Sequence, residues 1–147
     1  MDTLEATIRL MNDKLLLSSS SPGRSEIITD YLPPYGEGGG YFPTEIFLIS
    51  LGTCAGGTIL SLLRRFGRRV DAYSINIRGE LRDEHPKSFS KITMEFWITS
   101  QDVTMEDCEK TSLLAEKKYC PVWAMIRGNV QVESVFHINA GSSAEIL

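Results

Sequence analysis

Histidine and cysteine are both scarce in this chain, which has two histidines and three cysteines among its 147 residues. His85 and His137 are too few to predict a histidine-based metal site, and no Cys-x-x-Cys spacing indicates zinc. A small and odd number of cysteines is also unlike a disulfide scaffold and is typical of a reducing compartment. We therefore expect no bound metal.

Long apolar runs and a surplus of positive charge are absent as well. We expect no membrane span, because no stretch approaches about 18 apolar residues. The sequence begins MDTLEATIRL, with acids where a secretory signal would have basic residues. The net charge is −4, and the basic residues are scattered apart from the run Arg64–Arg69, which disfavours nucleic-acid binding. These absences predict a cytoplasmic protein without a membrane or nucleic-acid partner.

The composition that is present is ordinary for a globular protein, with 42% hydrophobic and 23% charged residues. A chain of this length can bury one good core, because domains commonly contain roughly 100–200 residues. We therefore expect a single domain over residues 1–147.

The first third of the chain reads as short strands separated by turns. Alternating segments within residues 5–11, 14–20 and 25–32 predict a three-stranded meander. Residues 33–43, PPYGEGGGYFP, are rich in glycine and proline and predict a loop. Such a loop either links two elements or lines a site.

Two long apolar helices and three further strands are predicted after this loop. Residues 73–81 and 92–98 alternate with period two and predict a hairpin, with Leu81 on the same buried face as Tyr73. A last strand is expected over residues 129–138. Runs of strands broken by two apolar helices indicate the α+β class.

The first helix is predicted from Pro43 to Phe66. Proline suits a first helical position, and Gly67 suits the residue just past the end. The segment is apolar nearly all round, so it should run through a core. Its central glycines, Gly52 and Gly56 among them, cost up to about 1 kcal/mol each in helix propensity. Close approach of another backbone or of a ligand would offset that cost.

The second helix is predicted from Thr104, with Asp107 completing a start that resembles a capping box, toward Ile126. Pro121 should kink or restart it. A restart would make Cys120 the N-cap, with its sulfur facing free backbone N–H groups, which favours a thiolate. Alternatively, Cys120 is only the small residue that a bend requires.

Cys54 lies in the middle of the first helix, where the helix dipole does little for its thiol. Activation would require a charged or hydrogen-bonding neighbour. Gly57 and Thr58 give the thiol a small-residue face. Taken singly, Cys54 and Cys120 are each typical of core packing. Two helices packed through glycines can, however, bring two cysteines within disulfide reach.

The run PTEIFLISLGTC leading into AGGTILSLLRR, then a hairpin and AEKKYCPVWAMI, resembles the OsmC/Ohr family. The resemblance covers the chain from Thr7 to about Ile138. It depends on one cysteine in the long helix, a later Cys-Pro-Val, and the order of strands around them. The pattern is nearer to the general OsmC-like branch than to the dedicated peroxidases.

The resemblance implies an OsmC-like α+β fold built as an intertwined homodimer with active sites at the subunit interface. It implies an antioxidant, stress-response activity, the thiol-dependent reduction of organic hydroperoxides, which requires no cofactor. Cys54 would attack the peroxide and become a sulfenic acid, and Cys120 would resolve it as a disulfide. The reductant that the resemblance implies is a dithiol of the lipoyl type.

The chain departs from the family's peroxidases at two activating residues. They have an arginine in the first hairpin, where this chain has the turn Asn12-Asp13, and a glutamate where it has Thr44. The neighbouring Glu45 points to the face opposite Cys54 and lies about 13 Å from it along a straight helix. Our candidates for activating the Cys54 thiolate are therefore Arg9, Arg24 and Glu45.

An apolar substrate pocket is predicted from Phe47, Tyr119 and Trp123 together with the loop of residues 36–42. The alternative function is a non-enzymatic OsmC-like dimer that binds small molecules or senses redox state. A cysteine hydrolase would need a histidine beside its nucleophile, and neither histidine is expected there.

Overall fold

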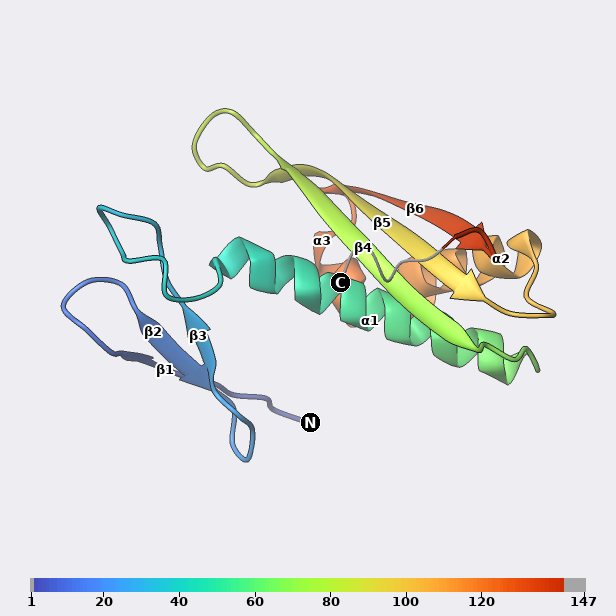
Figure 1. The fold of residues 1–147 in the computed structure, drawn as a ribbon, viewed down its shortest axis with the longest axis horizontal. Helices are drawn as coiled ribbons and strands as arrows, with labels where there is room; N and C mark the ends of the chain where they lie inside the picture. Colours follow the sequence, from blue (N-terminus) through green and yellow to red (C-terminus); the bar gives the residue numbers. More distant parts are fainter. Residues whose placement is uncertain (1, 142–147) are drawn as a thin grey trace. The chain divides into compact units, whose positions relative to one another are not determined.

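The computed structural model describes residues 2–141, which form two small sheets and three α-helices in an α+β arrangement (Figure 1). The chain divides between Phe47 and Leu48 into two compact units, so each is described separately. The α+β class predicted from the sequence is confirmed.

The first unit contains an antiparallel meander in the order β1-β2-β3, as predicted. Its strands β1 (Thr7–Leu10), β2 (Leu17–Ser20) and β3 (Ile27–Thr29) are shorter than the sequence segments suggested. The turn between β1 and β2 is closed by Asn12, whose side-chain oxygen accepts from the backbone N–H groups of Lys14 and Leu16 at 2.9 and 3.1 Å. The side chain of Asn12 therefore shapes this turn.

The glycine-rich loop is tied to the end of β3 by its backbone. Asp30 is buried and accepts from the N–H groups of Tyr31 at 2.7 Å and Gly39 at 2.9 Å. These bonds, that of Gly39 foremost, lower the pKa of Asp30. A Cβ at Gly40 would lie 2.5 Å from the carbonyl oxygen of Ile28. Glycine is thus required for backbone packing at this point of the loop.

Helix α1 (Pro43–Arg65) matches the predicted span to within one residue. Glu45 helps to begin it, because its carboxylate accepts from the backbone N–H of Phe42 at 2.8 Å. Gly67 ends it with φ of 83°, a conformation that favours glycine. Its buried side comprises Leu51, Gly52, Ala55, Gly56, Ile59, Leu62 and Leu63.

The expectation that no segment is apolar enough for a membrane span is wrong for α1. This helix is long and apolar enough to cross a membrane, by length and composition alone. Small residues such as Gly and Ala interrupt its run of large apolar side chains, but they carry no charge. Core helices of soluble proteins meet the same criterion, and part of α1 is buried against a sheet.

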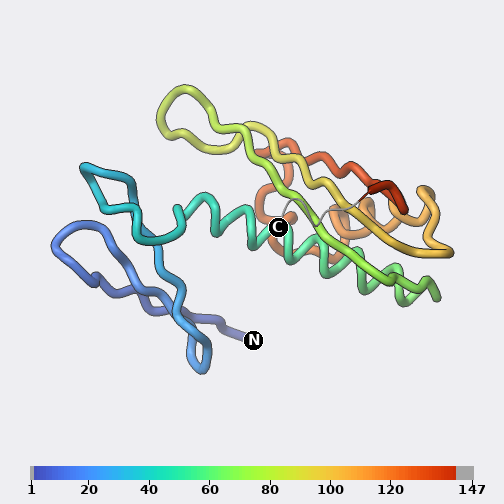
Figure 2. Tube along the Cα trace, viewed as in Figure 1, coloured from blue at the N-terminus to red at the C-terminus, as the bar shows by residue number. Residues whose placement is uncertain are grey.

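The second unit contains the sheet β4-β5-β6. Strands β4 (Ala72–Leu81) and β5 (Phe89–Thr99) form the predicted hairpin, and β6 (Gln131–Ile138) pairs with β5 in parallel, as Figure 2 shows. The alternation predicted for β5 is confirmed, because its inner face is buried. That face consists of Ile92, Met94, Phe96 and Ile98.

Leu81 does not share that burial, contrary to its predicted place on the inner face. Its side chain is 51% exposed. Leu81 is the last residue of β4, and the pairing register with β5 shifts just before it. The period-two pattern cannot reveal this shift.

The glycines of α1 allow β4 to approach the helix closely. A Cβ at Gly56 would lie 2.2 Å from a methyl carbon of Ile75, and one at Gly52 would touch Ile77 at 3.6 Å. The Tyr73 hydroxyl donates to the Gly56 carbonyl at 2.8 Å. The small residues of α1 are therefore explained in part by packing against β4, which runs alongside it in Figure 1.

The second helical segment consists of three pieces. Helix α2 (Met105–Leu114) begins with the predicted capping box between Thr104 and Asp107. It continues as one π-helical stretch, η1 (Ala115–Tyr119), and α3 (Pro121–Ile126) follows. The restart at Pro121 is confirmed, and Cys120 is the N-cap of α3.

Candidate active site

The two cysteines singled out in the sequence lie in contact. The Cys120 thiol donates to the Cys54 sulfur at 3.1 Å between the two Sγ atoms. Both thiols are free, Cys54 is partly exposed on α1, and Cys120 is 2% exposed at the start of α3. A disulfide requires an S–S bond of about 2.05 Å, so a small displacement brings the two sulfurs within bonding distance.

Cys120 is held by the backbone of α3. The N–H of Trp123 donates to its sulfur at 3.4 Å, which is the expected N-cap contact. Burial nevertheless dominates and raises the pKa of Cys120 to about 11, with a further rise from the hydrogen bond to Cys54. Of the two interpretations left open for Cys120, the raised pKa disfavours the thiolate, because removal from water outweighs the helix-terminal N–H groups.

This raised pKa predicts how Cys120 responds to pH. Its thiol binds its proton below about pH 11, so the reactive thiolate fraction rises throughout the range below that value. Alkylation of Cys120 by iodoacetamide in the reduced protein should accelerate about tenfold per pH unit between about pH 7 and 10. Peptide-resolved mass spectrometry measures this rate.

Cys108 provides an internal comparison for that experiment, because burial raises its pKa to about 11 as well. The Cys108 thiol should show the same rising profile. A Cys120 rate that levels off below about pH 9 would contradict the raised pKa.

A pocket of about 410 Å³ opens beside Cys54. A ligand in this pocket can therefore reach the Cys54 thiol, whereas Cys120 is buried in the core. The sequence analysis identified Tyr119 as a pocket residue and placed Gly57 and Thr58 beside the thiol. It missed Ser61, Leu62 and Arg65, although their spacing on one helix could have revealed them. The pocket is lined by Cys54, Gly57, Thr58, Ser61, Leu62, Arg65 and Tyr119.

The predicted pocket residues have different locations. Tyr119, 42% exposed, lines the Cys54 pocket. Trp123 is buried, and it lines a separate pocket with Glu109 between α2 and β6. Phe47 lies on α1 at the end of the first unit.

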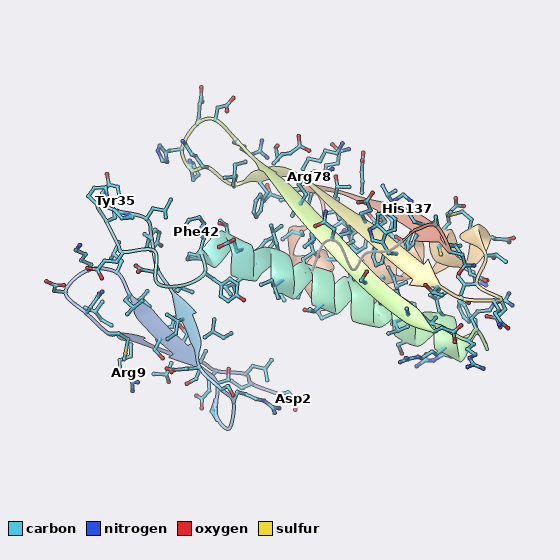
Figure 3. The ribbon with its side chains drawn as sticks, viewed as in Figure 1. Asp2, Arg9, Tyr35, Phe42, Arg78 and His137 are labelled. Atoms are coloured by element: carbon cyan, nitrogen blue, oxygen red, sulfur yellow. The ribbon has the colours of Figure 1, made fainter. Side chains whose placement is uncertain are left out.

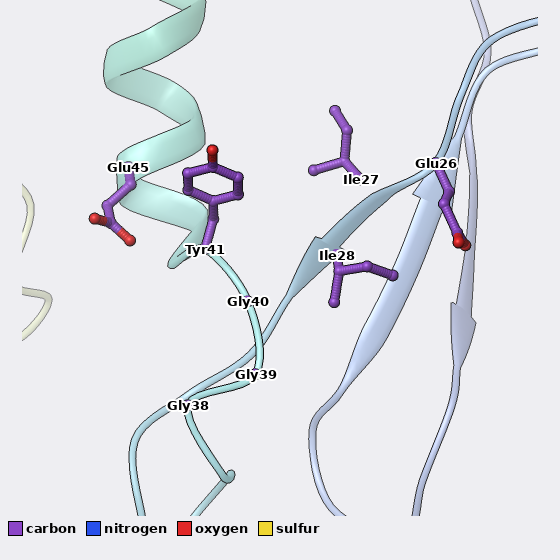
Figure 4. Close-up of a pocket in the computed structure, with 8 residues that line it drawn as sticks. All are labelled: Glu26, Ile27, Ile28, Gly38, Gly39, Gly40, Tyr41 and Glu45. Atoms are coloured by element: carbon purple, nitrogen blue, oxygen red, sulfur yellow. The ribbon is translucent and has the colours of Figure 1, made fainter. Parts of the chain in front are cut away.

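The predicted loop lines a pocket of its own within the first unit (Figure 4). This pocket, about 710 Å³, lies between β3 and the start of α1. Gly38, Gly39, Gly40 and Tyr41 form its loop side, and Glu45 lies at its helix side.

The three candidate activating residues all belong to the first unit. Arg9 lies on β1 opposite Ser18, with an exposed side chain (Figure 3). Arg24 lies in the exposed turn between β2 and β3. Glu45 is engaged by the backbone of Phe42 at the beginning of α1.

Neither His85 nor His137 lines the pocket beside Cys54. His137 on β6 contacts Glu95 at 2.9 Å and stacks on Trp97, with ring centroids 4.1 Å apart (Figure 3). His85 is exposed in the β4–β5 loop. Within residues 2–141, no group of three His, Cys, Asp or Glu side chains converges as a metal site would.

Known proteins share this arrangement of elements. The sequence profile of the family described as OsmC-like protein matches residues 36–135. Protein YhfA of Escherichia coli K12 is 26% identical over 98 residues, which span 67% of this chain and 73% of YhfA.

Solved structures with a similar fold align with a larger share of the chain. A hypothetical protein from Aquifex aeolicus aligns with a TM-score of 0.81 at 24% identity, over 97% of this chain and 100% of that protein. An organic hydroperoxide resistance protein OsmC from Legionella pneumophila aligns with a TM-score of 0.71 at 19% identity, covering 92% and 97%. Together these matches show the fold.

Proposed function

Because this chain belongs to the OsmC-like protein family, we propose that it is a thiol-dependent peroxidase that reduces organic hydroperoxides. The observation that carries the proposal is the contact of 3.1 Å between the Cys54 and Cys120 sulfurs. Structural neighbours described as organic hydroperoxide resistance proteins, from Legionella pneumophila and Bacillus subtilis, support a redox-related stress function.

The difference in exposure between the two cysteines supports a different role for each. Cys54 lines the pocket and can be reached by a peroxide, whereas Cys120 is buried. The Cys54 thiolate attacks one peroxide oxygen, an S–O bond forms, the O–O bond breaks, and the alcohol leaves after taking a proton. Cys54 is then a sulfenic acid, oxidised by two electrons.

Cys120 resolves the sulfenic acid. Its sulfur attacks the Cys54 sulfur, the S–O bond breaks, water leaves, and a Cys54–Cys120 disulfide forms. A dithiol reductant, of the lipoyl type in our proposal, restores both thiols by two exchange steps and is itself oxidised to a disulfide. The hydrogen bond from Cys120 to Cys54 supports this order, because it aligns the two sulfurs before the peroxide arrives.

In this proposal, Arg9 or Arg24 supplies the positive charge that stabilises the Cys54 thiolate. Glu45 would act by holding such an arginine, but its carboxylate already accepts from Phe42. The first hairpin turn, Asn12-Asp13, carries no arginine, and this departure favours the second candidate function, a non-enzymatic dimer that binds small molecules or senses redox state. Fast oxidation of Cys54 followed by turnover separates the peroxidase from that alternative.

The proposal includes a homodimer in the cytoplasm. An apolar pocket formed by Ile49, Leu60, Ile75 and Ile77 opens between α1 and β4, and it would suit burial against a second copy. The OsmC-like fold is typical of soluble proteins, which supports a core role for α1. Light scattering of the intact protein measures the oligomeric state directly.

The experiment that tests the peroxidase treats the reduced protein with one equivalent of cumene hydroperoxide. Intact-mass analysis and peptide mapping should find a prompt Cys54–Cys120 disulfide, while Cys108 stays reduced because it is buried. Repeated turnover is expected with dihydrolipoamide as reductant. Slow oxidation spread over all three thiols would sink the peroxidase and favour the non-enzymatic alternative.

A further inference from the structure

A line of residues on α1 joins Cys54 to a positive charge. Cys54, Thr58, Ser61 and Arg65 are spaced by four, three and four residues, and all four line the Cys54 pocket. At about 100° per residue, Arg65 falls within roughly 20° of the direction of Cys54. The pocket therefore extends along one face of the helix from the thiol toward the guanidinium group.

Arg65 is free to bind a ligand. Two other arginines of the same run are neutralised, because Arg68 pairs with Asp107 and Arg69 pairs with Asp71, each at 2.9 Å. In the part of the chain that the structure describes, no ion pair involves Arg65. Its charge is favourable at the helix C-terminus, but the same is true of Arg64, which does not line the pocket.

Arg65 is too distant from Cys54 to activate the thiol. Eleven residues correspond to about 16 Å between the two Cα atoms along the axis. Because helix side chains lean toward the N-terminus, the guanidinium is on the order of 10 Å from the thiol. That distance exceeds the screening length of about 8 Å at physiological ionic strength. A ligand that fills the pocket can reach both groups at once.

We propose that Arg65 is the residue that recognises an anionic group on the substrate, so that the pocket prefers hydroperoxides that carry a carboxylate a medium-length alkyl chain away from the peroxide. The inference rests on the proposed function for its substrate class. Arginine suits this role because its planar guanidinium binds a carboxylate through two hydrogen bonds. The exposed Tyr119 and the hydroxyls of Thr58 and Ser61 line the intervening space.

A thiol-alkylating probe tests the recognition without requiring peroxidase activity. Maleimidohexanoic acid and its methyl ester differ only in charge, and N-ethylmaleimide serves as a short neutral reference. In the reduced full-length protein, Cys54 should react faster with the acid than with the ester. Arg65→Gln should lower the rate with the acid about fivefold, as expected for one partly exposed charge pair, and should leave both neutral reagents unchanged.

Arg64→Gln is the matched control, because it removes the same charge from the adjacent, exposed position outside the pocket. Its acid-to-ester ratio should equal that of the parent protein. The effect of Arg65 should also shrink in 1 M salt, where the screening length falls to about 3 Å. Equal effects of the two variants, or no preference for the acid in the parent protein, would overturn the recognition role.

Two hydroperoxides then separate this inference from the proposed function. Cumene hydroperoxide is neutral and tests Cys54 oxidation alone, whereas a carboxylate-bearing alkyl hydroperoxide also tests Arg65. Failure of both to oxidise Cys54 removes the peroxidase but leaves the maleimide ratio as a valid test of anion recognition. Oxidation by both at rates that Arg65→Gln does not change removes Arg65 as a specificity residue and leaves the peroxidase intact.

Discussion

Replacing Cys54 by serine is expected to lower the rate of organic hydroperoxide reduction by at least about a thousandfold, because the hydroxyl is a far poorer nucleophile than the thiol. No other thiol can take over the reaction. Cys108 and Cys120 are both buried, and burial raises the pKa of each to about 11. A coupled assay with dihydrolipoamide and cumene hydroperoxide measures the loss.

Cys120→Ser and Cys108→Ser complete this experiment as controls. The Cys120 variant should still consume one equivalent of peroxide and leave a sulfenic acid on Cys54 that dimedone traps, since only the resolving thiol is missing. The Cys108 variant should retain turnover, because Cys108 lies apart from the pocket that Cys54 lines. If Cys54→Ser kept substantial activity, the assignment of Cys54 as the peroxidatic residue would be wrong.

Local chemistry made much of the helical structure predictable. Pro43 and Gly67 bracket α1 correctly, because a fixed backbone angle suits its first residue and a positive φ suits the residue after its end. The capping box at Thr104 and the restart at Pro121 follow from hydrogen bonds that each residue type can or cannot make. These features depend on residues close together in sequence.

Features that depend on distant partners were not predictable in the same way. The sequence pattern gives no pairing partner for β6, which lies parallel to β5. It also does not show the register shift at the end of β4, where Leu81 is exposed. The choice between the two interpretations of Cys120 also depended on distant partners. Its N-cap contact is local, whereas the burial that raises its pKa depends on the whole core.

The candidate site was likewise predictable only in part. The contact between Cys54 and Cys120 was expected from the resemblance to a known family, and their spacing of 66 residues carries no such information. Arg65 was noted only as part of the basic run Arg64–Arg69. The spacing that places Arg65 on the same face of α1 as Cys54 can be read from the sequence. Only the structure shows that both residues line one pocket.

The position of Cys54 depends on the core beneath α1, and Phe96 is the centre of that core. Its ring is fully buried, stacks on Phe136 with centroids 4.6 Å apart, and lies 6.0 Å from Tyr73. Tyr73 in turn donates to the Gly56 carbonyl of α1, two residues from Cys54. Packing around Phe96 therefore supports the helix that holds the thiol.

Phe96→Ala should lower the free energy of unfolding by about 3–5 kcal/mol, the usual cost of a cavity left by a buried phenylalanine. Urea denaturation followed by tryptophan fluorescence measures it, and both tryptophans lie in the second unit with Phe96. Phe66→Ala is the matched control, because Phe66 is 38% exposed and its removal should cost about 1 kcal/mol or less. Equal losses in the two variants would mean that Phe96 does not anchor this core. A larger loss for Phe96, together with slower Cys54–Cys120 disulfide formation, would connect the packing under α1 to the alignment of the two sulfurs.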